Sequence, residues 1–197
     1  MNSTTFKIAI FASGNGTNAE KIAKYFKNRQ DIKIVLILSN KPDAYVHTRA
    51  ENLDIPSITF NKVDFLQSDH VLDMLRKAEV DLVVLAGFLW LIPDNLIKAF
   101  PNRIVNIHPA LLPKYGGKGM YGENVHRAVK AADEKETGIT IHYVNQNYDE
   151  GRIIFQGKCE LIAEDTVETI ASKVHQLEYK HYPEVIEELI MKYHKNS

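Results

Sequence analysis

The chain has 197 residues and a mass of 22.4 kDa; 45% of its residues are hydrophobic and 25% are charged. This balance excludes a disordered or collagen-like chain, and the length suffices to bury a core without disulfides. The formal net charge of -1 lacks the basic surplus of a dedicated nucleic-acid or membrane-surface binder.

Cysteine content and hydropathy narrow the class further. The single cysteine, Cys159, excludes an internal disulfide and a zinc site built from several thiolates. No signal peptide or membrane span can be recognised, because the first apolar run ends by Ala12. We therefore expect a cytoplasmic protein that binds neither membranes nor nucleic acids.

Apolar runs alternate with helix-period stretches in the first half of the chain. The predicted strands are Lys7–Phe11, Ile32–Leu38, Ser57–Phe60, Leu82–Ala86 and Ile104–Ile107. The predicted helices lie before Lys27, at Tyr45–Asn52, around Val71–Ala78 and from Pro93 through Ala99. Short buried strands separated by helices predict a mostly parallel α/β sheet.

The pattern changes after Pro109. The prolines and glycines of Leu111–Gly122 predict a loop, and a helix is expected over Asn124–Ala132. Two further strands, Ile139–Val144 and Ile153–Glu160, are close enough in sequence to pair antiparallel.

A long C-terminal helix is predicted after these strands. Asp165 and Glu168 form a capping-box pattern that would open it, and Pro183 is expected to kink or restart it. No repeat or linker interrupts the chain. We predict one Rossmann-like α/β domain over residues 1–197, its mostly parallel central sheet flanked by helices and extended by antiparallel C-terminal strands.

The first candidate site is the turn from Gly14 to Asn18, between the first strand and the first helix. Glycines there let the backbone approach an anion, and free N–H groups at the helix N-terminus bind phosphate. With Ala19 the run also matches the dinucleotide fingerprint G-x-G-x-x-A. A dinucleotide site needs an acid near the end of the second strand, and Leu38-Ser39-Asn40 supplies none. A monophosphate site is favoured over NAD, with a plain glycine turn as the remaining alternative.

The second candidate site is Asn106-Ile107-His108-Pro109, at the end of a predicted strand. Residues two apart on a strand share a face, so Asn106 and His108 should stand together at the edge where open α/β sheets bind ligands. An amide and an imidazole suit a reaction in which a carbonyl oxygen gains negative charge. A histidine satisfied by backbone contacts is the equally weighted alternative.

Asp149 is the third candidate. An Asp before Glu150-Gly151 is usually a turn residue. If its loop folds over the sheet edge, its carboxylate would raise the pKa of His108 and keep that ring protonated. His142, on a predicted strand, is expected to be packed rather than catalytic, and the eight histidines show no metal-ligand spacing.

The run Asn106–Pro113 (NIHPALLP), together with Asp149-Glu150-Gly151, resembles the formyltransferase family that uses 10-formyltetrahydrofolate. Ser13–Asn18 (SGNGTN) and Leu82–Phe88 (LVVLAGF) are similar to the branch that formylates glycinamide ribonucleotide in purine synthesis. The likeness extends from about Lys7 to Glu188. It implies transfer of the formyl group to the amine of 5-phosphoribosylglycinamide, with the folate as co-substrate and no metal. We also expect a monomer or a weak homodimer.

The resemblance also implies roles for individual residues. Asn106, His108 and Asp149 match the family's catalytic residues. The residues that match contacts to the ribonucleotide are Gly16, Thr17, Asn18, His175 and Glu178. The residues that match the folate pocket are Leu89, Trp90, Leu91, Ile92, Asn106, Asn145, Gln146, Asn147, Tyr148 and Asp149. The resemblance further implies a cis peptide bond between Leu112 and Pro113.

The chain departs from the family's pattern at three places. Trp90 stands where the family often has an arginine, and only Lys62 lies near the position of another folate-contacting arginine. The loop Tyr115–Gly122 is longer and richer in glycine than the common form. It would shape substrate access or have no role.

Other readings of the chain remain open. Methionyl-tRNA formyltransferase and formyltetrahydrofolate deformylase resemble this catalytic core, but each adds a further domain, and a length of 197 residues disfavours both. A non-catalytic phosphosugar-binding protein would need only the glycine loop. The presence of Asn106, His108 and Asp149 favours an enzyme.

Overall fold

The computed structural model describes residues 5–195, which divide into two compact units, one ending at Val105 and the other beginning at Asn106. The expectation about a leader peptide also concerns residues 1–4, which lie outside this range. That the whole chain is one domain stays a prediction.

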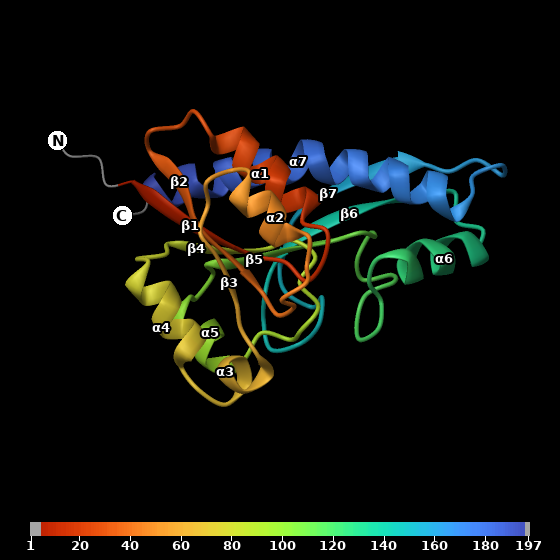
Figure 1. Cartoon of the computed structure of the whole chain (residues 1–197). Helices are drawn as coiled ribbons and strands as arrows, with labels where there is room; N and C mark the ends of the chain where they lie inside the picture. Colours follow the sequence, from red (N-terminus) through yellow and green to blue (C-terminus); the bar gives the residue numbers. More distant parts are fainter. Residues whose placement is uncertain (1–4, 196–197) are drawn as a thin grey trace. The chain divides into compact units, whose positions relative to one another are not determined.

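The first unit alternates strands and helices as the sequence predicts. Its elements are β1 (Phe6–Phe11), α1 (Thr17–Phe26), β2 (Ile32–Ser39), α2 (Val46–Glu51), β3 (Ser57–Thr59), α3 (Lys62–Leu66), α4 (His70–Lys77), β4 (Leu82–Leu85), α5 (Asp94–Ala99) and the start of β5 (Ile104–His108). Hydrogen bonding follows the order β3-β2-β1-β4-β5. The pairs β1–β2, β1–β4 and β2–β3 are parallel. Figure 1 shows α1 and α2 on one face of these strands and α3 to α5 on the other.

Helix α3 was not predicted from the sequence. Asn61 caps it, because its side-chain oxygen accepts the N–H groups of Val63 and Asp64 at 2.8 and 2.9 Å. Asp64 in turn accepts the N–H of Asn61, which completes a capping box. A five-residue helix has too little periodicity to stand out in a sequence, so the cap was its only signal.

The second unit contains the end of β5, α6 (Glu123–Ala131), β6 (Glu136–Tyr143), β7 (Ile153–Glu160) and α7 (Val167–Lys195). Hydrogen bonding follows β5-β6-β7, and β6 pairs with β7 antiparallel, as predicted. Helix α7 packs against β6, β7 and α6. The predicted fold class is confirmed: a mostly parallel, Rossmann-like α/β arrangement with antiparallel C-terminal strands.

Two details of α7 differ from the prediction. The capping pair is Thr166 and Thr169 rather than Asp165 and Glu168, because each threonine hydroxyl accepts the other residue's N–H, at 3.3 and 2.9 Å. Asp165 instead accepts the N–H of Ile162 at 2.9 Å. Of the two effects expected of Pro183, a restart is excluded, because the helix continues through it to Lys195, and a kink stays a prediction.

The Leu112–Pro113 peptide bond is cis, as the resemblance implied. Among residues 5–195, no helix is long and apolar enough to span a membrane.

Candidate active site

Asn106 and His108 lie on β5, with the buried Ile107 between them facing the other way. The His108 side chain is only 4% exposed. Its Nε2 lies 2.7 Å from the carbonyl oxygen of Tyr115. A carbonyl only accepts hydrogen bonds, so Nε2 carries a proton and donates it. The other ring nitrogen, Nδ1, is therefore the atom that gains or loses a proton.

The carboxylate of Asp149 lies beside this nitrogen. Its Oδ2 is 3.5 Å from Nδ1 of His108 and accepts the N–H of Gly117 at 3.0 Å. Asp149 itself adopts the left-handed backbone conformation, with φ of 58°. Asp tolerates this conformation better than most residues. The loop thus folds back as the catalytic interpretation requires, and Asp149 is more than a turn residue.

The close packing around Gly151 explains why a glycine ends this segment. A Cβ atom at this position would come within 1.6 Å of the carbonyl oxygen of Tyr143 and 3.3 Å of Nδ1 of His142. No side chain fits there, so the Asp-Glu-Gly sequence combines a charged group with the glycine that allows its loop to pack closely.

Asn106 contacts two members of the same cluster. Its Nδ2 lies 3.1 Å from Nε2 of His142 and 3.5 Å from Oδ1 of Asp149. His142 is 2% exposed, and its Nδ1 lies 2.8 Å from the carbonyl oxygen of Tyr143. The second unit thus brings all three predicted catalytic residues together, with His142 as a fourth member.

The charge states of the cluster differ from the prediction in one respect. Burial lowers the pKa of His108, and this outweighs the raising effects of Asp149 and of the Tyr115 carbonyl, so that the pKa lies below 6.5. The expectation that Asp149 keeps His108 protonated is therefore wrong for the chain without substrate. Asp149 acts in the expected direction, but desolvation of the ring is the larger effect.

Asp149 itself stays ionised near neutral pH. Burial raises the pKa of Asp149, but contact with His142, the charge of His108 and the N–H of Gly117 together lower it below 3.8. A proton that arrives at Nδ1 of His108 therefore faces a carboxylate already in place. This arrangement can accept a proton and hand it on.

The Gly-rich loop Tyr115–Gly122 supplies two of the backbone groups in this cluster, the Tyr115 carbonyl and the Gly117 N–H. The Tyr115 hydroxyl donates to Glu134 at 2.8 Å, which anchors the loop at its start. A side chain at Gly116 would force its neighbours to shift, because a Cβ there would approach Cδ2 of Leu112 to 2.6 Å and Cβ of Asp149 to 3.3 Å. The sequence alone did not predict this role.

The segment Gly14–Asn18 in the first unit contains the turn between β1 and α1 and the first two residues of that helix. Gly16 has φ of 73°, and a Cβ on it would approach Cγ2 of Val46 to 2.4 Å. Arg49 holds the turn: its Nε donates to the carbonyl of Asn15 at 2.8 Å, and it forms an ion pair with Glu20. The residues predicted to bind phosphate thus sit in a tight, fixed turn that begins a helix.

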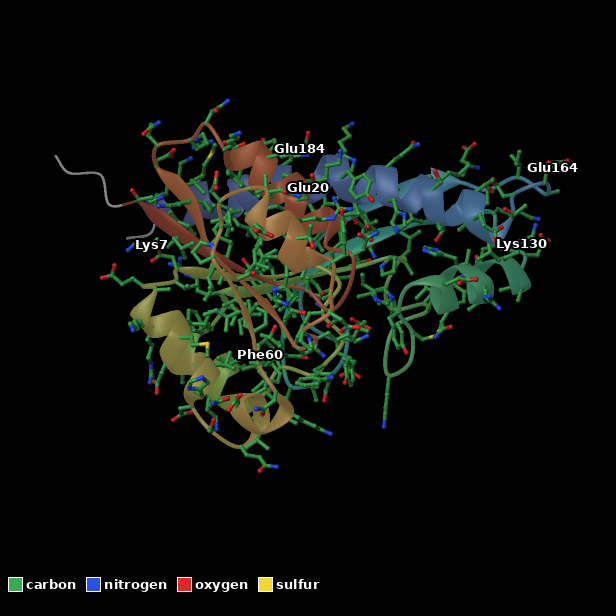
Figure 2. All side chains as sticks on the ribbon, in the orientation of Figure 1. Lys7, Glu20, Phe60, Lys130, Glu164 and Glu184 are labelled. Atoms are coloured by element: carbon green, nitrogen blue, oxygen red, sulfur yellow. The ribbon has the colours of Figure 1, made fainter. Side chains whose placement is uncertain are left out.

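The predicted folate stretch Leu89–Ile92 follows β4 in the same unit. Trp90 is half-buried, and its ring centroid lies 5.8–6.3 Å from those of three phenylalanines, Phe60, Phe65 and Phe88. Phe60 is labelled in Figure 2. Leu89 and Leu91 are each 36% exposed. An aromatic cluster with exposed leucines fits a flat apolar ligand, but the folate role of this stretch stays a prediction.

The remaining predicted contacts lie in the second unit. His175 is exposed, and its ring stacks against Tyr179 with centroids 5.9 Å apart. Glu178 is 6% exposed, an unusual degree of burial for a carboxylate. In the loop Asn145–Asp149, Asn145 accepts the N–H of Asn147 at 3.0 Å. Their roles as ligand contacts stay predictions.

Comparison with known proteins places this cluster in a family. The formyl transferase family model matches residues 6–186. The chain belongs to the formyl transferase family. Within the part of the chain that the structure describes, no group of three or more His, Cys, Asp or Glu residues could hold a metal ion. The expectation that this member of the family uses no metal stays a prediction.

Named relatives agree with this assignment. The chain is 42% identical to phosphoribosylglycinamide formyltransferase of Bacillus subtilis over 191 residues, which cover 93% of this chain and 94% of that protein. It is 45% identical to the chloroplastic enzyme of that name from Arabidopsis thaliana, covering 91% of this chain but only 64% of the longer plant protein. The solved structure of the Bacillus halodurans phosphoribosylglycinamide formyltransferase matches with a TM-score of 0.84 at 36% identity, over 95% of this chain and 96% of that one.

His142 is the member of the cluster that the sequence interpretation assigned to packing. One signal could have found it: Thr140 and His142 are polar residues that alternate with Ile139 and Ile141 on the strand, and they thus share a face. Thr140 uses that face to contact Ala110, since its hydroxyl donates to the Ala110 carbonyl at 2.7 Å. The same face brings His142 to Asn106.

Proposed function

We propose that this protein transfers the formyl group of 10-formyltetrahydrofolate to the amine of 5-phosphoribosylglycinamide. The products are formylglycinamide ribonucleotide and tetrahydrofolate, and the reaction belongs to purine synthesis. The observation that carries the proposal is the meeting of Asn106, His108 and Asp149 in one buried cluster. Membership of the formyl transferase family and relatives named phosphoribosylglycinamide formyltransferase support the substrates.

The reaction begins when the uncharged amine of the ribonucleotide attacks the formyl carbon. A C–N bond forms, and the formyl oxygen becomes an oxyanion. Asn106 is the donor for this oxyanion, through an N–H of Nδ2. A fixed donor of this kind lowers the barrier because it needs no reorientation as the charge develops.

His108 and Asp149 handle the proton. The lowered pKa of His108 leaves Nδ1 free of a proton near neutral pH, so it can take one from the nitrogen that has attacked. Asp149 stabilises the imidazolium that forms. The same proton then moves to N10 of the folate as the bond between the formyl carbon and N10 breaks, so no net proton is released.

Binding roles follow the family pattern. We assign the phosphate of the ribonucleotide to Gly16, Thr17 and Asn18, and its ribose to Glu178, with His175 as a further contact. We assign the folate to Leu89–Ile92 and Asn145–Asp149. We also propose that the enzyme needs no metal. We further propose that it is a monomer or a weak homodimer, and gel filtration measures this oligomeric state.

An absorbance assay for loss of the formyl group from 10-formyltetrahydrofolate tests the proposal. We expect turnover only when glycinamide ribonucleotide is present, and formylated ribonucleotide as the product. Turnover with water alone would indicate a deformylase, and turnover only with methionyl-tRNA a tRNA formyltransferase. Ribonucleotide binding without turnover would indicate a non-catalytic phosphosugar-binding protein.

A further inference from the structure

We propose that His142 is a positioning residue that sets the orientation of the Asn106 amide, so that an N–H rather than the oxygen of Asn106 faces the reacting formyl group. The inference rests on the proposed function, because it concerns the oxyanion donor of that reaction. His142 touches Asn106 rather than the substrates, so it acts through this neighbour.

The first step of the argument is the protonation of the His142 ring. Nδ1 lies 2.8 Å from the carbonyl oxygen of Tyr143. Because a carbonyl oxygen only accepts, Nδ1 carries a proton. In the neutral ring Nε2 then has none and is an acceptor. Its nearest polar partner is Nδ2 of Asn106 at 3.1 Å.

The second step is the choice between two partners of Nε2. Oδ1 of Asp149 lies 3.6 Å away, farther than Nδ2 of Asn106 at 3.1 Å. A proton on Nε2 would be aimed at that carboxylate and would leave the Asn106 amide nitrogen facing another donor. The shorter distance to Asn106 favours Nε2 as an acceptor.

The third step is what this does to Asn106. Both neighbours of its Nδ2, Nε2 of His142 and Oδ1 of Asp149, are acceptors. If the amide rotated by half a turn, its oxygen would meet two acceptors, which is unfavourable. One N–H is held by His142, and the second makes only a contact of 3.5 Å with Asp149. That second N–H is available to the oxyanion.

Two substitutions at this position separate positioning from packing. In His142→Asn, the side-chain amide can still donate to Tyr143 near the position of Nδ1, but nothing reaches the position of Nε2. In His142→Gln, the longer side chain can place its oxygen near the position of Nε2 and accept from Asn106. Both variants are neutral, polar and smaller than histidine.

We expect His142→Asn to lower kcat with little change in KM for either substrate. Outright removal of an oxyanion donor costs roughly 100- to 1000-fold. An amide that is misoriented for part of the time should cost less, about 10- to 100-fold. His142→Gln should stay within about threefold of the unmodified enzyme, because the acceptor is restored.

A result in which His142→Asn keeps its kcat would overturn the proposal, and so would an equal loss in the Gln variant with both variants folded by thermal melting. In an Asn106→Ala background, His142→Asn should have little further effect, since the proposed route runs through Asn106. A full additional loss there would show an independent role.

Nuclear magnetic resonance of the unmodified protein keeps the test independent of how the variants fold. Nitrogen-15 spectra of the imidazoles report which ring nitrogens carry protons. We expect the neutral His142 ring to carry its proton on Nδ1; a neutral ring with the proton on Nε2 would contradict the proposal. Absence of formyl transfer in the unmodified enzyme would instead refute the proposed function, which separates the two failures.

Discussion

At the scale of single residues, the protein combines a carboxylate that stays ionised with an imidazole that stays neutral. Two opposing effects produce the second state: burial lowers the pKa of His108 more than Asp149 raises it. For catalysis this is useful, because a buried neutral imidazole is ready to accept a proton. An imidazolium already paired with Asp149 could not accept a further proton.

Removal of these two side chains tests the pair. His108→Ala should lose most turnover while both substrates still bind, because its role begins when the amine attacks. Asp149→Asn should also lower turnover, and should lower the pKa of His108 further because its raising charge is gone. The lower limb of the pH profile of kcat should then shift to lower pH; a shift to higher pH would contradict the assignment.

The two substitutions should not be additive. Residues that act on one proton lose their common function once, so the double variant should resemble His108→Ala alone. Full additivity, measured in kcat, would mean that Asp149 and His108 have independent roles. His181→Asn is a control that should leave kcat unchanged, since His181 pairs with Glu184 on α7 outside the cluster.

At the scale of elements, the turn before α1 depends on Gly16 for a reason that the sequence did not reveal. The sequence predicts only that glycines in this turn let the backbone approach an anion. In the structure, a side chain at Gly16 would collide with Val46 on α2 and strain a backbone with φ of 73°. The glycine thus allows α1 and α2 to approach, and phosphate binding would depend on this packing.

Gly16→Ala should therefore weaken ribonucleotide binding while folate binding persists. Gly14→Ala is the matched control, since a Cβ there meets no atom within 4 Å and the position has no positive φ. Calorimetric titration of both variants with each substrate gives the comparison. Equal weakening by the two substitutions would exclude a special role of Gly16, and saturable binding of NAD would favour a dinucleotide site.

The same scale shows where sequence interpretation succeeds and fails. Long apolar strands such as β2, predicted as Ile32–Leu38, and the helical period of α4 were predicted because burial dictates their patterns. Helix α3 and the exact start of α7 were missed or misplaced, because short caps depend on which of several polar side chains reaches a given N–H. Several candidates, such as Asp165 and Thr166, are nearly equivalent in the sequence.

At the scale of the whole chain, the sequence motif identified Asn106, His108 and Asp149, and the structure brings them together. The sequence could not identify the contributions of Tyr115 and Gly117, because these are made by backbone groups, which every residue type has. Nor could it give the balance of burial and charge at His108. That balance depends on how completely the surrounding elements exclude water.

The whole molecule's stability should depend on pH through a histidine outside the catalytic cluster. His126 on α6 is 2% exposed, and its Nδ1 has no hydrogen-bond partner among residues 5–195. Burial, with the nearby His175, lowers the pKa of His126 from 6.5 to about 4. Below pH 6.5 the unfolded chain therefore binds a proton that the folded chain does not, and stability falls as the pH falls.

We expect this site alone to cost about 2 kcal/mol of unfolding free energy between about pH 7 and pH 5. Urea unfolding at the two pH values measures the loss, and His126→Leu should reduce it by about this amount. Val129→Ala is a core substitution on the same helix that removes no titrating group. It should lower stability equally at both pH values. The comparison uses differences between pH values, so a general packing defect in His126→Leu does not obscure it. A pH dependence unchanged in His126→Leu would show that His126 is protonated in the folded protein as readily as in the unfolded chain.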